Sequence, residues 1–206
     1  MGSGYRRQGE DGSTGVVGEA FLVSTGVVAL AEIGDKTQLL ALVLSTRFRR
    51  PIPIILAIFI ATLANHALAG AVGAWVATLM GPATMRWVLG LSFIAMAIWT
   101  MVPDKYQEGS RPMPRLGVFG TTLVAFFLVE MGDKTQIATV ALAARYSSLV
   151  SVVAGTTCGM MLANVPAVLL GDVAARRLPM RVVHGVAAAI FAALGFSVLL
   201  GLGSLP

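Results

Sequence analysis

The sequence is poor in the charged residues that cover the surfaces of soluble proteins. Only 12% of its residues are charged, 56% are hydrophobic, and the mean hydropathy is +0.82. A soluble domain carries about 25% charged residues, so this composition excludes that class and indicates a polytopic membrane protein. The single cysteine, Cys158, lies in an apolar segment and cannot form an intramolecular disulfide.

The positive net charge of +5 does not indicate a nucleic-acid partner. The basic residues fall in short connections between apolar runs, as the topology of a membrane protein requires. Nine of them lie on one predicted side: Arg47, Arg49, Arg50, Lys105, Arg111, Arg115, Arg176, Arg177 and Arg181. The other side carries four: Arg6, Arg7, Arg86 and Arg145. The side with nine is expected to be cytoplasmic, which puts both termini outside.

Six apolar segments, most of them 20 residues or longer, are the predicted membrane-spanning helices, and they form two groups of three. They run from about 20 to 45, 54 to 80, 87 to 102, 117 to 144, 149 to 174 and 182 to 202. We predict an all-α membrane protein with a disordered N-terminal tail over residues 1–18. The first three-helix repeat follows over 19–102, then a cytoplasmic linker over 103–115 and a second three-helix repeat over 116–206.

A seven-residue pattern occurs once in each group. Residues 32–38 read EIGDKTQ and residues 130–136 read EMGDKTQ, each near the middle of the first span of its group. The segment Leu63-Ala64-Asn65 likewise matches Leu162-Ala163-Asn164. Because three spans per repeat is an odd number, the two copies enter the membrane from opposite sides. Such inverted repeats are typical of secondary transporters with a site at the midplane.

The two copies of the pattern place six charged side chains at membrane depth. Each such charge costs about 3 kcal/mol at the bilayer centre on insertion scales, so the charges are expected to face inward and meet one another. On a continuous helix, Glu32 would share a face with Asp35 and with Lys36. Gly34 and Gly132 are expected to break or unwind their helices and let backbones approach closely.

These groups predict a site for a hard divalent cation. Four acids and two lysines leave two net negative charges, which suits one divalent cation or two protons. Oxygen ligands favour Mg, Ca or Mn over Zn or Cu, which usually recruit His or Cys. A carboxyl group without a metal can hold a proton instead, so metal and protons are expected to compete. The predicted metal residues are Glu32, Asp35, Glu130, Asp133, Gln38, Gln136, Asn65 and Asn164, with Lys36 and Lys134 balancing the charge.

The duplicated Glu-x-Gly-Asp-Lys-Thr motif, in the first and fourth of six predicted spans, resembles the hallmark of the Gdt-one-like family of cation transporters. The resemblance covers the chain from about Ala20, and both motifs match fully. It implies manganese transport coupled to protons, with calcium as an additional cargo and with Glu32, Asp35, Glu130 and Asp133 as the metal-site acids. It further implies export across a prokaryotic plasma membrane, with the lipid bilayer, a divalent cation and protons as partners and no cofactor.

The charged motifs have three other interpretations. In the first, each Glu–Lys pair is a salt bridge that only locks two helices together. Such a role does not require the pairs to be duplicated at the same depth in both halves. An intramembrane aspartyl protease using Asp35 and Asp133 is hard to reconcile with a lysine directly after each aspartate. A passive cation channel is the closest rival. His66 and His184 have no histidine at the matching position of the other repeat, and we interpret them as packing or gating residues.

Overall fold

The computed structural model describes residues 7–102, 116–170 and 180–202, and the regular elements in these ranges are helices. The first half contains α1 (Arg7–Glu32), α2 (Lys36–Phe48), α3 (Pro51–Leu79) and α4 (Pro82–Thr100). The second half contains α5 (Gly117–Glu130), α6 (Lys134–Arg145), α7 (Leu149–Leu170) and α9 (Met180–Leu199). The predicted linker over 103–115 lies outside the described residues.

Four described helices are long and apolar enough to cross a membrane: α3, α4, α7 and α9. The number rises to five if α1 and α2 form one span, bent by 69° between Glu32 and Lys36. In the second half, α5 is the counterpart of α1. It is a shorter apolar helix, which ends at Glu130 before the second break. The protein is therefore an all-α membrane protein over its described residues, and both predicted helix breaks are confirmed.

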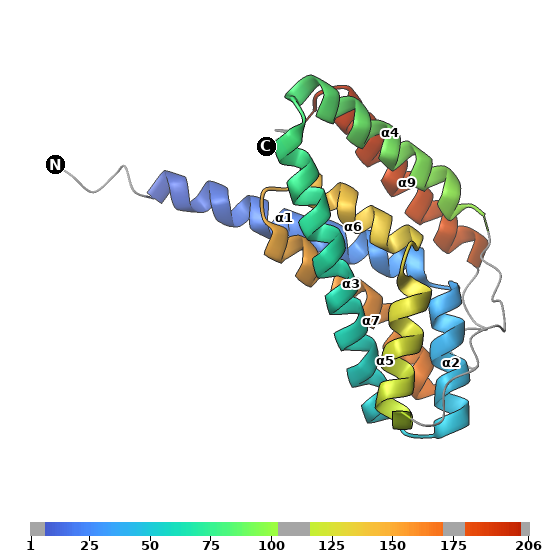
Figure 1. Ribbon diagram of the computed structural model, residues 1–206. Helices are drawn as coiled ribbons and strands as arrows, with labels where there is room; N and C mark the ends of the chain where they lie inside the picture. Colours follow the sequence, from blue (N-terminus) through green and yellow to red (C-terminus); the bar gives the residue numbers. More distant parts are fainter. Residues whose placement is uncertain (1–6, 103–115, 171–179, 203–206) are drawn as a thin grey trace.

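Helix α1 begins at Arg7, inside the segment that the sequence predicted to be disordered. The prediction is wrong for residues 7–18, and residues 1–6 lie outside the described part of the chain. No proline interrupts this stretch. Once a helix is nucleated, each added residue gains a backbone hydrogen bond, so α1 can extend beyond its apolar part. Its N-terminal end projects away from the other helices (Figure 1).

The two halves of the chain pack against each other through helices of both. In the first half α1 lies against α7, and in the second half α5 lies against α3. The outer helices α4 and α9 run side by side (Figure 1). The rings of Phe93 and Phe191 stack in their interface, with centroids 6.5 Å apart. Both helix breaks are thereby brought to the middle of the molecule (Figure 1). The charged motifs thus lie among helices of both halves.

Small residues allow the closest of these helix contacts. A Cβ atom added to Gly155 on α7 would lie 2.5 Å from the Phe21 carbonyl oxygen of α1. A Cβ atom added to Gly159 would likewise lie 2.5 Å from the Thr25 carbonyl oxygen of α1. The Gly-x-x-x-Gly spacing is typical of helices in close contact within membranes, and here it sets the approach of α1 to α7.

We expect Gly155→Ala to lower the melting temperature of the detergent-solubilised protein. The added methyl group must push backbone away from backbone, and such overpacking typically costs about 1–3 kcal/mol. Gly26→Ala is the matched control within a helix, because a Cβ there meets nothing within 4 Å. Tryptophan fluorescence during heating measures both variants. An equal melting temperature for wild type and Gly155→Ala would contradict the role assigned to this glycine.

Candidate metal site

Both copies of the motif fold into the same turn between two helices. Gly34 has φ 82° and Gly132 has φ 79°, a left-handed conformation that glycine adopts without steric cost. The Asp35 amide donates to the Glu32 carbonyl oxygen, and the Asp133 amide donates to the Glu130 carbonyl oxygen, both at 3.0 Å. The glycine of each motif therefore ends one helix and lets the next helix start in a new direction.

The glutamine of each motif holds this turn in place. Gln38 Oε1 accepts a hydrogen bond from the Gly34 amide at 2.8 Å, and Gln136 Oε1 accepts one from the Gly132 amide at 2.6 Å. Gln38 Nε2 also donates to the Ala163 carbonyl oxygen of α7 at 2.9 Å. The sequence predicted both glutamines as metal ligands. In the structure their side-chain oxygens accept hydrogen bonds from backbone amides at the helix breaks.

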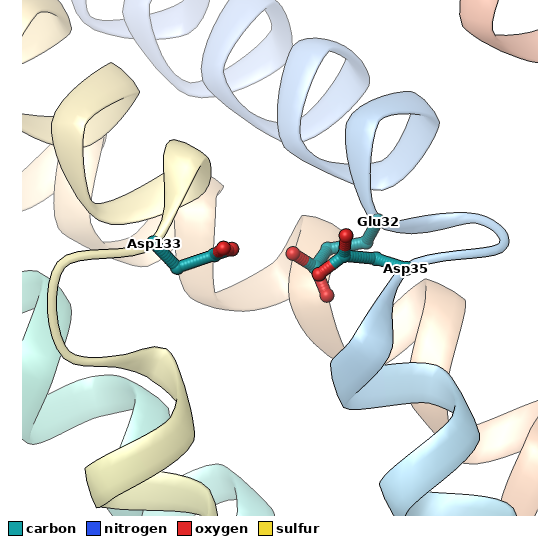
Figure 2. A group of neighbouring side chains, drawn as sticks. All are labelled: Glu32, Asp35 and Asp133. Atoms are coloured by element: carbon teal, nitrogen blue, oxygen red, sulfur yellow. The ribbon is translucent and has the colours of Figure 1, made fainter. Parts of the chain in front are cut away.

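Three of the four predicted acids meet at the breaks. Glu32, Asp35 and Asp133 each offer a carboxylate oxygen, and these oxygens lie within 4.8 Å of one another. Glu32 and Asp35 come from the first break, and Asp133 points toward them from the second (Figure 2). All three residues are buried. We call this group the three-acid cluster; carboxylate oxygens at this spacing suit a hard divalent cation.

Each lysine pairs with the aspartate of the other motif. Lys36 Nζ lies 2.8 Å from Asp133 Oδ1, and Lys134 Nζ lies 2.7 Å from Asp35 Oδ1. The helix breaks between Glu32 and Lys36, so the pairing expected for these residues on one continuous helix is replaced by the contact across the two motifs. The second pair is the more enclosed, since the Lys134 side chain is 1% exposed and that of Lys36 is 27% exposed.

The motif threonines donate hydrogen bonds to the acids. Thr37 Oγ1 donates to Glu32 Oε2, and Thr135 Oγ1 donates to Asp133 Oδ2 at 3.2 Å. Neither threonine was among the residues predicted for the site. The signal that could have found them is their identical position in the two motifs, three residues after each glycine.

Glu130, the fourth acid, lies outside the three-acid cluster and faces α3. Its carboxylate accepts hydrogen bonds from Thr62 Oγ1 at 3.1 Å and from Asn65 Nδ2 at 3.1 Å. His66 Nε2 lies 3.5 Å from Glu130 Oε1. All four side chains are buried. The two glutamates therefore differ in surroundings, although they occupy the same position in the repeat.

The predicted asparagines are both buried beside the site region. Asn65 touches Glu130, whereas Asn164 Nδ2 donates to the Met160 carbonyl oxygen on its own helix at 3.1 Å. The side-chain oxygens of both asparagines have no hydrogen-bond partner among the described residues. Each asparagine therefore has an oxygen available to a ligand.

The two histidines lie closer to the motifs than the sequence indicated. His66 contacts the carboxylate of Glu130, and His184 Nε2 lies 3.0 Å from the Ile33 carbonyl oxygen in the first break. Neither residue has a histidine at the matching position of the other repeat. The repeat pattern that identified the other residues could not have found them.

Comparison with known proteins gives the family. The family model described as "Divalent cation/proton antiporter GDT1" matches residues 20–108 and 118–204, which covers most of the chain. The chain belongs to this GDT1 family. Membership confirms the resemblance carried by the motifs and places the protein among transporters of divalent cations, not among enzymes. The aspartyl protease interpretation is thereby excluded; each aspartate is instead paired with a lysine.

Two curated relatives agree with this assignment. A protein of Vibrio cholerae serotype O1 named "Putative manganese exporter" is 52% identical over 170 residues, covering 82% of this chain and 84% of the relative. "GDT1-like protein 3" of Arabidopsis thaliana is 26% identical over 215 aligned positions, covering 91% of this chain and 72% of the relative. No solved structure matches the chain.

Proposed function

We propose that this protein exports manganese in exchange for protons, by alternating access to a site formed by both motifs. The observation that carries the proposal is the three-acid cluster, in which both motifs contribute oxygens within 4.8 Å. The proposal also draws on the family and on the name of the Vibrio relative. Calcium is a second candidate cargo, because oxygen ligands alone serve both cations.

The lysines give this site a way to release its cargo. A divalent cation at the three-acid cluster would compete with Lys36 and Lys134 for the carboxylates of Asp133 and Asp35. When the cation leaves, each ammonium group can return to its aspartate, so the acids need not be left unpaired in the membrane. In this proposal Glu32 and Glu130 exchange protons, and the two aspartates remain charged.

Six spans in two inverted repeats remain the proposed architecture. The α5–α6 pair would be the sixth span, broken like α1–α2 at the motif. Three observations support this arrangement. The two breaks have the same turn. Helix α1 packs on α7 and its counterpart α5 packs on α3, and the family model matches two segments of the chain. Both termini outside and a plasma-membrane location remain proposals that protease accessibility of tagged termini in intact cells would test.

Proteoliposomes test the function and separate an exchanger from a channel. An imposed pH gradient is expected to drive Mn²⁺ uphill into the vesicles while protons move the other way. A passive channel would carry Mn²⁺ only down its own gradient, with no proton movement linked to it. Wild-type protein that moves no Mn²⁺ under either condition would refute the proposed function, and Ca²⁺ in parallel vesicles gives the preference between the cargoes.

A further inference from the structure

The surroundings of Glu130 contain buried polar atoms that the fold does not use. Asn65 Oδ1 and both ring nitrogens of His66 have no hydrogen-bond partner among the described residues. Both side chains are fully buried. An unsatisfied buried polar atom costs about 1–3 kcal/mol, and such atoms in a native protein call for an explanation, which includes an ion that they hold.

The same atoms surround a carboxylate at distances that a metal ion can bridge. His66 Nε2 and Glu130 Oε1 lie 3.5 Å apart. Two transition-metal bonds of about 2.1 Å each, to nitrogen and to oxygen, span separations up to about 4.2 Å. Thr62 Oγ1 lies 3.1 Å from the same Glu130 Oε1, and Asn65 Nδ2 lies 3.1 Å from Glu130 Oε2. The side-chain oxygens of Thr62 and Asn65 are therefore near enough to complete a ligand set by side-chain rotation.

We propose that Glu130, Asn65 and His66 form a second cation subsite beside the three-acid cluster, and that its imidazole nitrogen selects a transition-metal ion such as Mn²⁺ over Ca²⁺. The inference rests on the proposed function and names the source of its selectivity. Ca²⁺ takes oxygen ligands. Oxygen ligands suit Mn²⁺ as well, but Mn²⁺ belongs to the first-row transition metals, which also bind imidazole nitrogen, although it does so more weakly than the later metals of the series. A mixed set of nitrogen and oxygen ligands therefore favours Mn²⁺ over Ca²⁺. The three-acid cluster offers carboxylate oxygens only and does not make this distinction.

Only one half of the protein carries this subsite. By the Leu-Ala-Asn correspondence, His66 matches Val165 and Thr62 matches Met161. Glu32 therefore has neither an imidazole nor a hydroxyl from the matching positions of α7. An exporter with two symmetric acid sites would not need this difference, so we assign selection to the Glu130 half.

Pulsed electron paramagnetic resonance of bound Mn²⁺ tests the nitrogen ligand directly. The protein contains two histidines, so a tag-free wild type loaded with Mn²⁺ is expected to show nitrogen coupling that changes when histidine is labelled with ¹⁵N. His66→Gln should lose this coupling and His184→Gln should keep it. Absence of histidine coupling in the labelled wild type would overturn the proposal even if no His66 variant folds.

Transport gives the second readout. In proteoliposomes, His66→Gln is expected to lower the ratio of Mn²⁺ to Ca²⁺ flux by about 10-fold or more, since loss of a partner in a metal site typically costs 10–100-fold in affinity. An unchanged ratio in a folded His66→Gln protein would refute the selectivity role. Failure of wild type to move Mn²⁺ would instead refute the proposed function, so the two failures are distinguishable.

Discussion

Asp35→Asn is expected to abolish Mn²⁺ binding and to destabilise the protein more than Asp133→Asn does. Both changes remove a charged oxygen ligand from the three-acid cluster. The expected loss of Mn²⁺ affinity is about 100-fold or more, beyond the 10–100-fold typical of residues that only support a ligand.

The two variants should differ in stability because their lysine partners differ in exposure. Asp35→Asn removes the carboxylate 2.7 Å from Lys134, whose side chain is 1% exposed. Breaking a buried ion pair by removing one partner costs about 3–5 kcal/mol. The side chain of Lys36, the partner of Asp133, is 27% exposed. Its ammonium group can turn toward water, so removal of the Asp133 carboxylate should cost less.

Calorimetry with Mn²⁺ and thermal melting in detergent measure the two effects separately. The double variant Asp35→Asn with Lys134→Gln is the matched control: it should recover much of the melting temperature and none of the Mn²⁺ binding. Equal melting temperatures for the two single variants would contradict the assigned burial of the Lys134 pair. Wild-type Mn²⁺ affinity in both of them would remove the aspartates from the site.

Glu32→Gln is expected to abolish proton-coupled exchange while leaving weak Mn²⁺ binding. The amide keeps the shape of the side chain and one oxygen that can accept the Thr37 hydrogen bond. It cannot take up a proton when the metal leaves, so the return half of the exchange cycle loses its counter-ion. Glu130→Gln should have the same effect on exchange, with a further disturbance of its contacts to Thr62 and Asn65.

Mn²⁺ flux and internal pH recorded together in proteoliposomes decide this prediction. Glu19→Gln is the matched control on the same helix, because Glu19 accepts a hydrogen bond from the Tyr146 hydroxyl and an amide oxygen can do so as well. This control should exchange Mn²⁺ for protons at the wild-type rate. If Glu32→Gln does the same, the proton assignment to Glu32 is wrong.

The sequence predicted the helix breaks and their place in the molecule. Gly34 and Gly132 follow glutamates in the middle of apolar segments, and charge at that depth must turn inward. The positive φ at both glycines confirms the local part of this argument. The start of α1 was predicted less well, because glycine and charge at a chain end are weak signals against the extension of an existing helix.

By itself the sequence determined the identity of the charged residues, their duplication and the turn that each motif forms, because these depend on neighbours along the chain. Only the tertiary structure decided which partner each residue meets. Lys36 reaches Asp133 instead of Glu32 because the break turns α2 toward the other motif. Glu130 meets His66 because α5 packs on α3. Such contacts join residues far apart in the chain, and their geometry is set by helix packing, which no local pattern encodes.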